Sequence, residues 1–288
     1  MFDAIVVGKG ILGATTARAL RAQGRTVLVI DREEPLAGTN ASAGHLRPST
    51  KFTGLSNDDY ETCLTTLDDI YGLTEETFKV RVKVIGTVKE EISIARVDPS
   101  RLEGMKYLTG NVKKIVSWSK TPRILVQTNS GIKEFSCRLL VLALGCWTLE
   151  LLGDHFDASE FYFRRGVSPR FKDNGVEAMI EPWAPYKYMM VGRLDSGELW
   201  TSDGTAIKPE NWTSERRDTC EARLRNWIGS QSKAHRIDSG IRPFHKLSKP
   251  CLLKPINPKE TIWVLTGGGK FGTLAAAWAA KKLQQVQL

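Results

Sequence analysis

Apolar runs and a helical repeat follow one another at the start of the chain. Ile5–Val7 is a continuous apolar run, which is typical of a parallel strand buried on both faces. Residues 14–22 carry apolar side chains at helical spacing, Gly24 ends that pattern, and residues 26–31 (TVLVID) form a second apolar run. The order strand, helix, strand predicts the beginning of a parallel α/β sheet.

The other end of the chain repeats part of this pattern. Residues 266–280 read TGGGKFGTLAAAWAA, which predicts a glycine-rich turn and a helix after an apolar strand. A single dinucleotide needs only one such turn, so the second turn calls for its own explanation. An ordinary loop before an amphipathic helix is one possibility, although three successive glycines cost chain entropy.

Between these ends the pattern predicts mostly strands. Residues 112–118 and 123–128 predict two strands joined around SKTPR, and residues 138–147 (RLLVLALGCW) predict a buried strand that ends at Gly145. Residues 186–192 (YKYMMVG) predict another strand, and residues 78–84 (FKVRVKV) predict one with basic and valine side chains on opposite faces. A helix is expected around residues 216–225.

Gly8, Gly10 and Gly13 form the pattern G-x-G-x-x-G between the first strand and its helix. In this pattern the first glycine permits a tight turn, the second lets a pyrophosphate approach the backbone, and the third lets helix and strand pack closely. The helix N-terminus offers N–H groups and positive potential to the phosphates. Asp31 ends the second strand, where it is placed to accept hydrogen bonds from a ribose. We therefore predict an adenine-dinucleotide site.

The segment after Asp31 favours FAD over NAD. Residues 32–49 (REEPLAGTNASAGHLRPS) are rich in small polar side chains, and no third strand follows quickly. Such a loop suits close backbone approach to a long ligand.

Several short motifs occur in the order found in one enzyme family and cover most of the chain. The chain resembles the FAD-dependent amine and amino-acid oxidases of the D-amino-acid, glycine and sarcosine oxidase type, and it is similar to the short bacteriophage oxidases of thymidine hypermodification. The motifs are GKGILG (8–13) with Asp31, SAG (42–44), VDP (97–99), GNV (110–112), ALGCW (143–147), SDGT (202–205), GIRP (240–243) and GGGKFG (267–272).

The resemblance implies an α/β fold, with a Rossmann-type FAD-binding domain and an inserted small antiparallel-sheet substrate domain, like a shortened glycine oxidase. We expect residues 1–50, 95–152 and 236–288 in the FAD-binding domain, and residues 51–94 and 153–235 in the substrate domain, facing DNA. The shortening falls between residues 44 and 97 and between 147 and 242, which favours an open site and a large substrate.

The resemblance also implies non-covalent FAD, with the second glycine-rich turn over the flavin ring. There a helix N-terminus and Lys270 would offset the negative charge of reduced flavin. The residues expected to bind FAD are Gly8, Gly10, Ile11, Leu12, Gly13, Asp31, Arg32, Ser42, Ala43, Gly44, Val112, Gly145, Trp147, Gly267, Gly268, Gly269, Lys270, Phe271 and Gly272.

Four residues are candidates for the chemistry. Arg242 falls where the family has its carboxylate-binding arginine, whose fork a lysine replaces poorly; a surface salt bridge is the alternative. Lys270 is a candidate for helping oxygen accept electrons. Tyr188, with Tyr186 beside it, falls where relatives have a substrate-contacting tyrosine, or is a half-buried sheet residue. His45 faces the flavin or lies in a plain loop.

A formal net charge of +9 is the unusual bulk property. For any one basic cluster a solvated surface is the simpler interpretation, but several on the substrate side favour phosphate contacts with double-stranded DNA. A nucleotide entering such a site would be flipped out of the duplex. Trp183, Trp200 and Trp212 lie among the clusters, either to stack on bases or to pack in the core. The predicted DNA contacts are Lys79, Arg81, Lys83, Arg164, Arg165, Arg170, Lys172, Arg216, Arg217, Lys246 and Lys249.

The remaining composition narrows the setting. Five cysteines without a CxxC pair and four histidines without paired spacing argue against a disulfide framework and a metal site. A reducing cytoplasm suits these cysteines. We expect no membrane helix, since no apolar run is long enough. Cys251 and His45 remain the candidates for a covalent flavin link.

Three functions follow. The first is an oxidase that converts N-glycinyl-thymidine in DNA to 5-aminomethyl-deoxyuridine, glyoxylate and hydrogen peroxide, with oxygen as acceptor. The second is an oxidase of free glycine, sarcosine or another small amino acid. The third is a flavin-bound, catalytically idle DNA-binding module.

Overall fold

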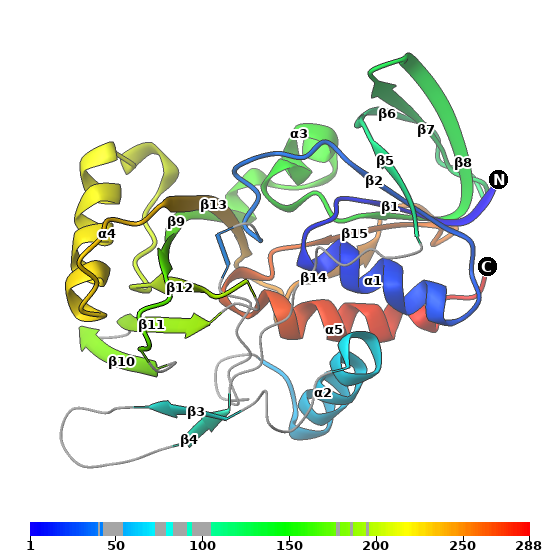
Figure 1. The fold of residues 1–288 in the computed structure, drawn as a ribbon. Helices are drawn as coiled ribbons and strands as arrows, with labels where there is room; N and C mark the ends of the chain where they lie inside the picture. The colour runs from blue at the N-terminus through cyan, green and yellow to red at the C-terminus, as the bar shows by residue number, and fades with distance from the viewer. Residues whose placement is uncertain are drawn as a thin grey trace.

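The computed structural model describes residues 1–39, 41–42, 54–72, 79–82, 91–93, 105–176, 179–184, 187–193 and 196–288. These residues form two sheets side by side, and the first strand and the last helix of the chain both lie at the same sheet (Figure 1). The helices are α1 (Ile11–Ala22), α2 (Asn57–Tyr71), α3 (Thr148–Leu152), α4 (Ser214–Trp227) and α5 (Gly272–Gln284).

The first sheet has a parallel centre. Its order is β14 (Leu252–Pro255), β15 (Ile262–Thr266), β8 (Gly131–Leu142), β1 (Phe2–Val7), β2 (Val27–Asp31) and β5 (Lys106–Thr109). Strands β15, β8, β1, β2 and β5 pair in parallel, and β14 is antiparallel to β15. The first half of β8 pairs instead with β7 (Arg123–Thr128), which pairs with β6 (Asn111–Ser117). The predicted buried strands at both ends of the chain are confirmed.

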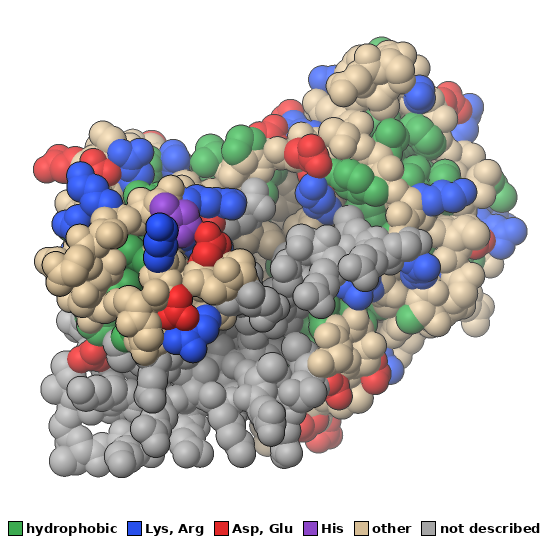
Figure 2. Space-filling model, viewed as in Figure 1, with side chains coloured by type: hydrophobic (Ala, Val, Ile, Leu, Met, Phe, Trp, Pro, Cys, Tyr) green, Lys and Arg blue, Asp and Glu red, His purple; other side chains and the backbone are tan. Residues whose placement is uncertain are grey.

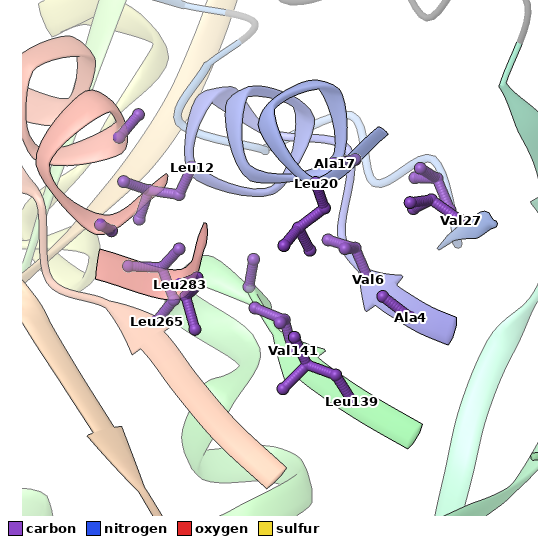
Figure 3. Packing of buried hydrophobic residues seen from close by; sticks show 14 of the residues in the cluster. Ala4, Val6, Leu12, Ala17, Leu20, Val27, Leu139, Val141, Leu265 and Leu283 are labelled. Atoms are coloured by element: carbon purple, nitrogen blue, oxygen red, sulfur yellow. The ribbon is translucent and has the colours of Figure 1, made fainter. Parts of the chain in front are cut away.

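Alternate residues of the central strands supply two cores. On one face, Ala4 and Val6 of β1 pack with Leu20 of α1 and Leu283 of α5 (Figure 3). On the other face, the neighbouring residues of β1 pack against β6, β7, β8 and α3. Helix α5 is alanine-rich on its buried side, so its backbone can lie close to α1 and to the sheet.

The second sheet carries the predicted insertion. Its order is β13 (Arg236–His245), β9 (Phe161–Lys172), β12 (Glu198–Ser202), β11 (Lys187–Arg193), β10 (Met179–Ala184), β3 (Lys79–Val82) and β4 (Glu91–Ser93). All pairs are antiparallel except β10 with β3. Helix α4 covers one face by packing Cys220, Leu224 and Ile228 against Val167 and Phe171.

Two segments pack with a different sheet from the one that the predicted domain bounds imply, and the bounds themselves stay a prediction. Residues 57–71 form α2, whose buried Cys63 and Leu67 pack on Leu274 and Ala277 of α5, so this part of residues 51–94 lies with the first sheet. Conversely, β13 pairs with β9 along ten residues and therefore belongs to the second sheet, although residues 236–245 were expected in the FAD-binding domain. Sequence patterns did not separate these cases because a helix and a strand each carry the same signal in either domain.

Candidate functional site

The N-terminal glycine turn has the close packing that its pattern predicts. Gly8 has a φ of 104°, and a Cβ there would overlap the carbonyl oxygen of Ala143. A Cβ on Gly13 would overlap the carbonyl oxygen of Gly8. These glycines therefore let β1, β8 and the N-terminus of α1 meet, and Gly13 acts through packing because it does not line the pocket described below.

Asp31 organises the loop beside this turn. Its carboxylate accepts hydrogen bonds from the backbone N–H of Lys9 (2.7 Å) and of Glu33 (2.6 Å). Thr39 adds a second tie, since its hydroxyl accepts from the N–H of Ile11 at 2.9 Å, in the first turn of α1. The end of β2 and the start of α1 are thus held in one arrangement, with carboxylate lone pairs left to accept from a ribose.

Arg32 joins β2 to the segment that follows β8. Its guanidinium donates to both carboxylate oxygens of Glu150 at 3.0 Å and lies 4.9 Å from the ring centroid of Trp147. The hydrogen bonds to Glu150 raise the pKa of Arg32 and lower that of Glu150. This fork fixes the Trp147 ring at the pocket edge. Beside it, burial raises the pKa of the Cys146 thiol to about 12.

The second glycine turn connects β15 to α5. Gly267 and Gly269 have φ values of 79° and 51°, which favour glycine, and a short 3-10 turn (Gly269–Phe271) leads into α5 at Gly272. A Cβ on Gly269 would lie 2.5 Å from the Phe244 ring. Phe271, the N-cap residue of α5, makes no capping hydrogen bond through its side chain. The N-terminus of α5 is therefore suited to a ligand with negative charge.

One elongated pocket joins the two turns. Its volume is about 320 Å³, and it lies where the surface is hollowed between the two sheets (Figure 2). It runs past the ends of β1 and β2, where parallel-sheet folds bind ligands. The predicted residues that line it are Gly8, Gly10, Ile11, Leu12, Asp31, Arg32, Ser42, Val112, Gly145, Trp147, Arg242, Gly268, Gly269, Lys270, Phe271 and Gly272.

A long nucleotide cofactor fits this pocket. The pocket has a helix N-terminus at each end, α1 for a pyrophosphate and α5 for an electron-rich ring. The Thr39 hydroxyl accepts from the N–H of Ile11 in α1, and glycines occupy both approaches. Sequence reasoning missed Thr39, Asn111, Lys113 and Met190 as lining residues. The sequence offered a weak indication for two of them: Asn111 lies in the GNV motif, and Thr39 lies in the polar loop of residues 32–49.

Arg242 enters this pocket from β13. Burial lowers the pKa of its guanidinium, and no carboxylate among the described residues forms an ion pair with it. Its Nη2 lies over Gly166 of β9, where a Cβ would be only 2.9 Å away. The surface salt bridge considered for Arg242 is therefore not formed with any residue that the structure describes. A half-buried arginine on a pocket wall, with no ion pair to a described carboxylate, is suited to bind an anionic ligand.

The SDGT segment supports the pocket beside Arg242. Ser202 and Gly204 line it, while Asp203 is buried between them. The carboxylate of Asp203 accepts from Arg223 of α4 at 2.7 Å and from the N–H of Thr205 at 2.8 Å. Asp203 therefore holds this loop in place, a role that sequence reasoning did not assign.

Several predicted residues are placed differently or lie outside the description. Gly267 shapes the second turn without lining the pocket, and Cys251 is buried in the core between the sheet and α5. Tyr188 lies on β11, opposite Pro182, and its side chain is outside the description. Ala43, Gly44, His45, Tyr186 and Lys83 fall outside the described residues, as do the side chains of Lys79 and Arg81.

The described residues among the predicted DNA contacts differ in their surroundings. The prediction that Arg170 contacts DNA is wrong, because Arg170 is only 8% exposed and forms an ion pair with Asp238 at 2.8 Å. Arg170 is therefore a structural residue of β9. Arg164 and Arg165 are neighbours on a strand and therefore point to opposite faces. Lys172, Arg216, Arg217, Lys246 and Lys249 are exposed, and basic side chains near α4 alternate with acidic ones (Figure 2).

The aromatic and metal predictions have separate outcomes. Trp200 is 1% exposed and packs in the core, and Trp212 stacks under Arg165 at 4.8 Å.

Among the described residues no group of three His, Cys, Asp or Glu side chains is arranged to hold a metal ion. No described helix is long and apolar enough to cross a membrane.

Comparisons with known proteins agree with this site. Residues 3–89 match a protein-family model described as FAD dependent oxidoreductase. The uncharacterized oxidoreductase YurR of Bacillus subtilis (strain 168) is 54% identical over 44 residues, which are 15% of this chain and 12% of that protein. The chain therefore spans only a small part of this curated relative. The predicted cofactor, FAD, agrees with the family match and with the shape of the pocket.

Solved structures are similar over almost the whole chain. The glycine oxidase of Geobacillus kaustophilus has a TM-score of 0.69 at 14% identity, covering 98% of this chain and 93% of that one. The iminodiacetate oxidase of Chelativorans sp. BNC1 gives 0.68 at 16%, covering 98% and 94%. The L-proline dehydrogenase of P. horikoshii gives 0.71 at 14%, covering 98% and 92%. The predicted fold, a Rossmann-like sheet with a second, mostly antiparallel sheet, is confirmed.

Proposed function

We propose that the protein is an FAD-dependent oxidoreductase that acts on an amine carrying a carboxylate. The observation that carries this proposal is Arg242, which is half-buried in the wall of the pocket and has no acidic partner among the described residues. The similarity to solved amine and amino-acid oxidases supports the same class of substrate.

Residues at the two ends of the pocket would bind different parts of the cofactor. Gly8, Gly10 and the N-terminus of α1 would hold the pyrophosphate, and Asp31 would accept a hydrogen bond from the adenosine ribose. Gly268 and Gly269 leave room for the ring system beside the N-terminus of α5. Bound FAD supplies a two-electron acceptor for a hydride.

The protein's own groups orient the substrate and stabilise charge. Arg242 binds the carboxylate through a guanidinium fork, which fixes the position of the adjacent carbon. The N–H groups at the start of α5 would stabilise the negative charge of reduced flavin. The substrate carbon loses a hydride to the flavin and its nitrogen loses a proton to solvent, so the amine becomes an imine. Water then adds to the imine, and the carbon–nitrogen bond breaks to give an amine and an oxo acid.

For the substrate itself we propose an N-glycinyl group on thymidine in DNA. The methylene of this group would be oxidised, releasing glyoxylate and leaving 5-aminomethyl-deoxyuridine, and oxygen would take the electrons as hydrogen peroxide. Support comes from the net charge of +9, from the exposed basic side chains Lys172, Lys246 and Lys249, and from the resemblance to short bacteriophage oxidases. Free glycine or sarcosine is the second candidate, favoured by the likeness to solved glycine oxidases.

Glyoxylate release tests both candidates. The purified protein, loaded with FAD, is incubated in air with duplex DNA bearing N-glycinyl-thymidine, and in parallel with glycine and with sarcosine. Turnover of the DNA alone supports the DNA substrate, and turnover of the free amines alone supports the second candidate. The Arg242→Gln variant is expected to retain FAD and lose turnover with either substrate, whereas the surface variant Arg123→Gln should match the unmodified protein.

A further inference from the structure

Two arginines lie directly opposite each other on the β9–β13 pair. The antiparallel register places Arg242 opposite Arg164 and Phe244 opposite Tyr162. Since side chains alternate along a strand, all four lie on one face of the sheet. The Tyr162 and Phe244 rings confirm this, because they stack with centroids 4.7 Å apart at 11°. Phe244 also adjoins Gly269 of the pocket, so this face looks toward the second glycine turn.

Like charges directly opposite one another destabilise a sheet. Neither arginine forms an ion pair with a carboxylate among the described residues. Arg164 donates to the carbonyl oxygen of Phe163 at 3.0 Å and lies 5.2 Å from the Tyr162 ring centroid. Arg242 is half-buried, and desolvation lowers the pKa of its guanidinium. Each guanidinium is therefore suited to pair with an anion supplied by a ligand.

The two guanidinium groups point in opposite directions along the face. Nη2 of Arg242 lies over Gly166, two residues after Arg164 on β9, and the Arg164 guanidinium lies over Tyr162, two residues before it. A strand rises ~3.3 Å per residue, which separates the two charged heads by on the order of 10 Å. An amine with a single carboxylate can therefore reach only one of them.

We propose that Arg164 binds a second anionic group of the substrate. The site then takes an extended amine with a carboxylate at Arg242 and a phosphate or a second carboxylate at Arg164. This inference rests on the proposed role of Arg242. Tyr162 is 37% exposed beside Arg164, so its ring gives the connecting part of the substrate a flat apolar surface. Free glycine lacks the second anion, whereas a nucleotide carries one.

Unreactive ligands of graded length test the spacing on the FAD-loaded protein. The probes are acetate, butanedioate, octanedioate and 6-phosphonohexanoate, and binding is followed by the change in visible flavin absorbance. We expect the two long probes to bind about tenfold more tightly than acetate, as one charge-assisted hydrogen bond allows, and butanedioate to show no gain. Octanedioate against 6-phosphonohexanoate then tells whether a carboxylate or a phosphate is preferred.

Two variants of Arg164 test whether this residue causes the tighter binding of the long probes. Arg164→Gln should bind acetate normally and lose the advantage of the long probes, and Arg164→Lys should restore part of it. Arg123→Gln, which removes a guanidinium from β7, should keep the full advantage. Long probes no tighter than acetate, or an Arg164→Gln variant weakened equally for all probes, would overturn the inference. If Arg164→Gln does not fold, the length series on the unmodified protein still decides.

The variant Arg242→Gln separates this inference from the function on which it rests. Loss of acetate binding in Arg242→Gln supports the carboxylate site whatever Arg164 does. Unchanged acetate binding in that variant contradicts the proposed function and the inference together.

Discussion

Substitution of Gly166 by alanine tests whether the backbone of β9 sets the position of Arg242. The added Cβ would lie 2.9 Å from Nη2 of Arg242 and 3.4 Å from the carbonyl oxygen of Thr205. The first distance is below van der Waals contact, and the guanidinium is the movable partner because it ends a flexible side chain. The expected response is a shift of the guanidinium away from β9, with little change in the sheet.

The size of the effect follows from the bond that is disturbed. A hydrogen bond between charged groups contributes about 1.5–3 kcal/mol, and a displaced fork keeps only part of it. A loss of about 1.4 kcal/mol raises a dissociation constant tenfold. We therefore expect Gly166→Ala to raise KM about tenfold. The value of kcat should change less, since the carboxylate is held equally before and during hydride transfer.

Steady-state oxidation of the substrate identified by glyoxylate release, together with the melting temperature and FAD content, checks this expectation. Gly153→Ala is the matched control, because a Cβ at Gly153 meets nothing within 4 Å and its φ is not positive. An unchanged KM in Gly166→Ala, alongside a raised KM in Arg242→Gln, would refute the argument that Gly166 positions the arginine. A large fall in melting temperature would instead show that the sheet yields.

Three other predictions concern the cofactor site and the protein's response to pH. Gly13→Ala should lower the melting temperature and the bound FAD, because its Cβ overlaps the Gly8 carbonyl oxygen and such overpacking costs about 1–3 kcal/mol; flavin-to-protein ratio and calorimetry measure this, and normal values for both would contradict it. Arg32→Ala should weaken FAD binding about tenfold by freeing the Trp147 ring, and fluorescence titration measures this affinity. An unchanged affinity for FAD would show that the contacts of Arg32 with Glu150 and Trp147 do not contribute to cofactor binding. Burial raises the pKa of the Cys137 thiol to about 12, above its value in the unfolded chain, so the folded state disfavours the thiolate. The free energy of unfolding should therefore be unaffected by this thiol below about pH 8.5 and should fall as pH rises toward 12. The melting temperature measured from about pH 8 to 11 should fall accordingly, and a flat profile would contradict this.

The nucleotide-binding half of the site was predictable because its signal is local. Gly8, Gly13 and Asp31 lie within one strand–helix–strand unit, where the turn geometry dictates residue type. The second turn, Gly267–Gly269, was also visible, since consecutive glycines permit positive φ values that few other residues adopt.

The substrate half was less predictable because its contacts are distant in sequence. Arg242 was placed by resemblance, but that no described carboxylate pairs with it became visible only with the pairing of β13 and β9. The same pairing shows that Arg170 meets Asp238, which no pattern of spacing reveals. Basic residues that looked equivalent along the chain thus separate into buried partners, opposite faces of one strand and exposed positions.

The first and last segments share one core and one pocket, and this affects how the protein is made. Strand β1 and helix α1 are synthesised before β15 and α5, which cover their apolar face. Until residues 262–284 follow, the growing chain lacks the cover for Ala17, Leu20 and their neighbours and has only half of the pocket. We therefore expect FAD to bind only after both segments have been made, and the exposed apolar face to be prone to aggregation before then.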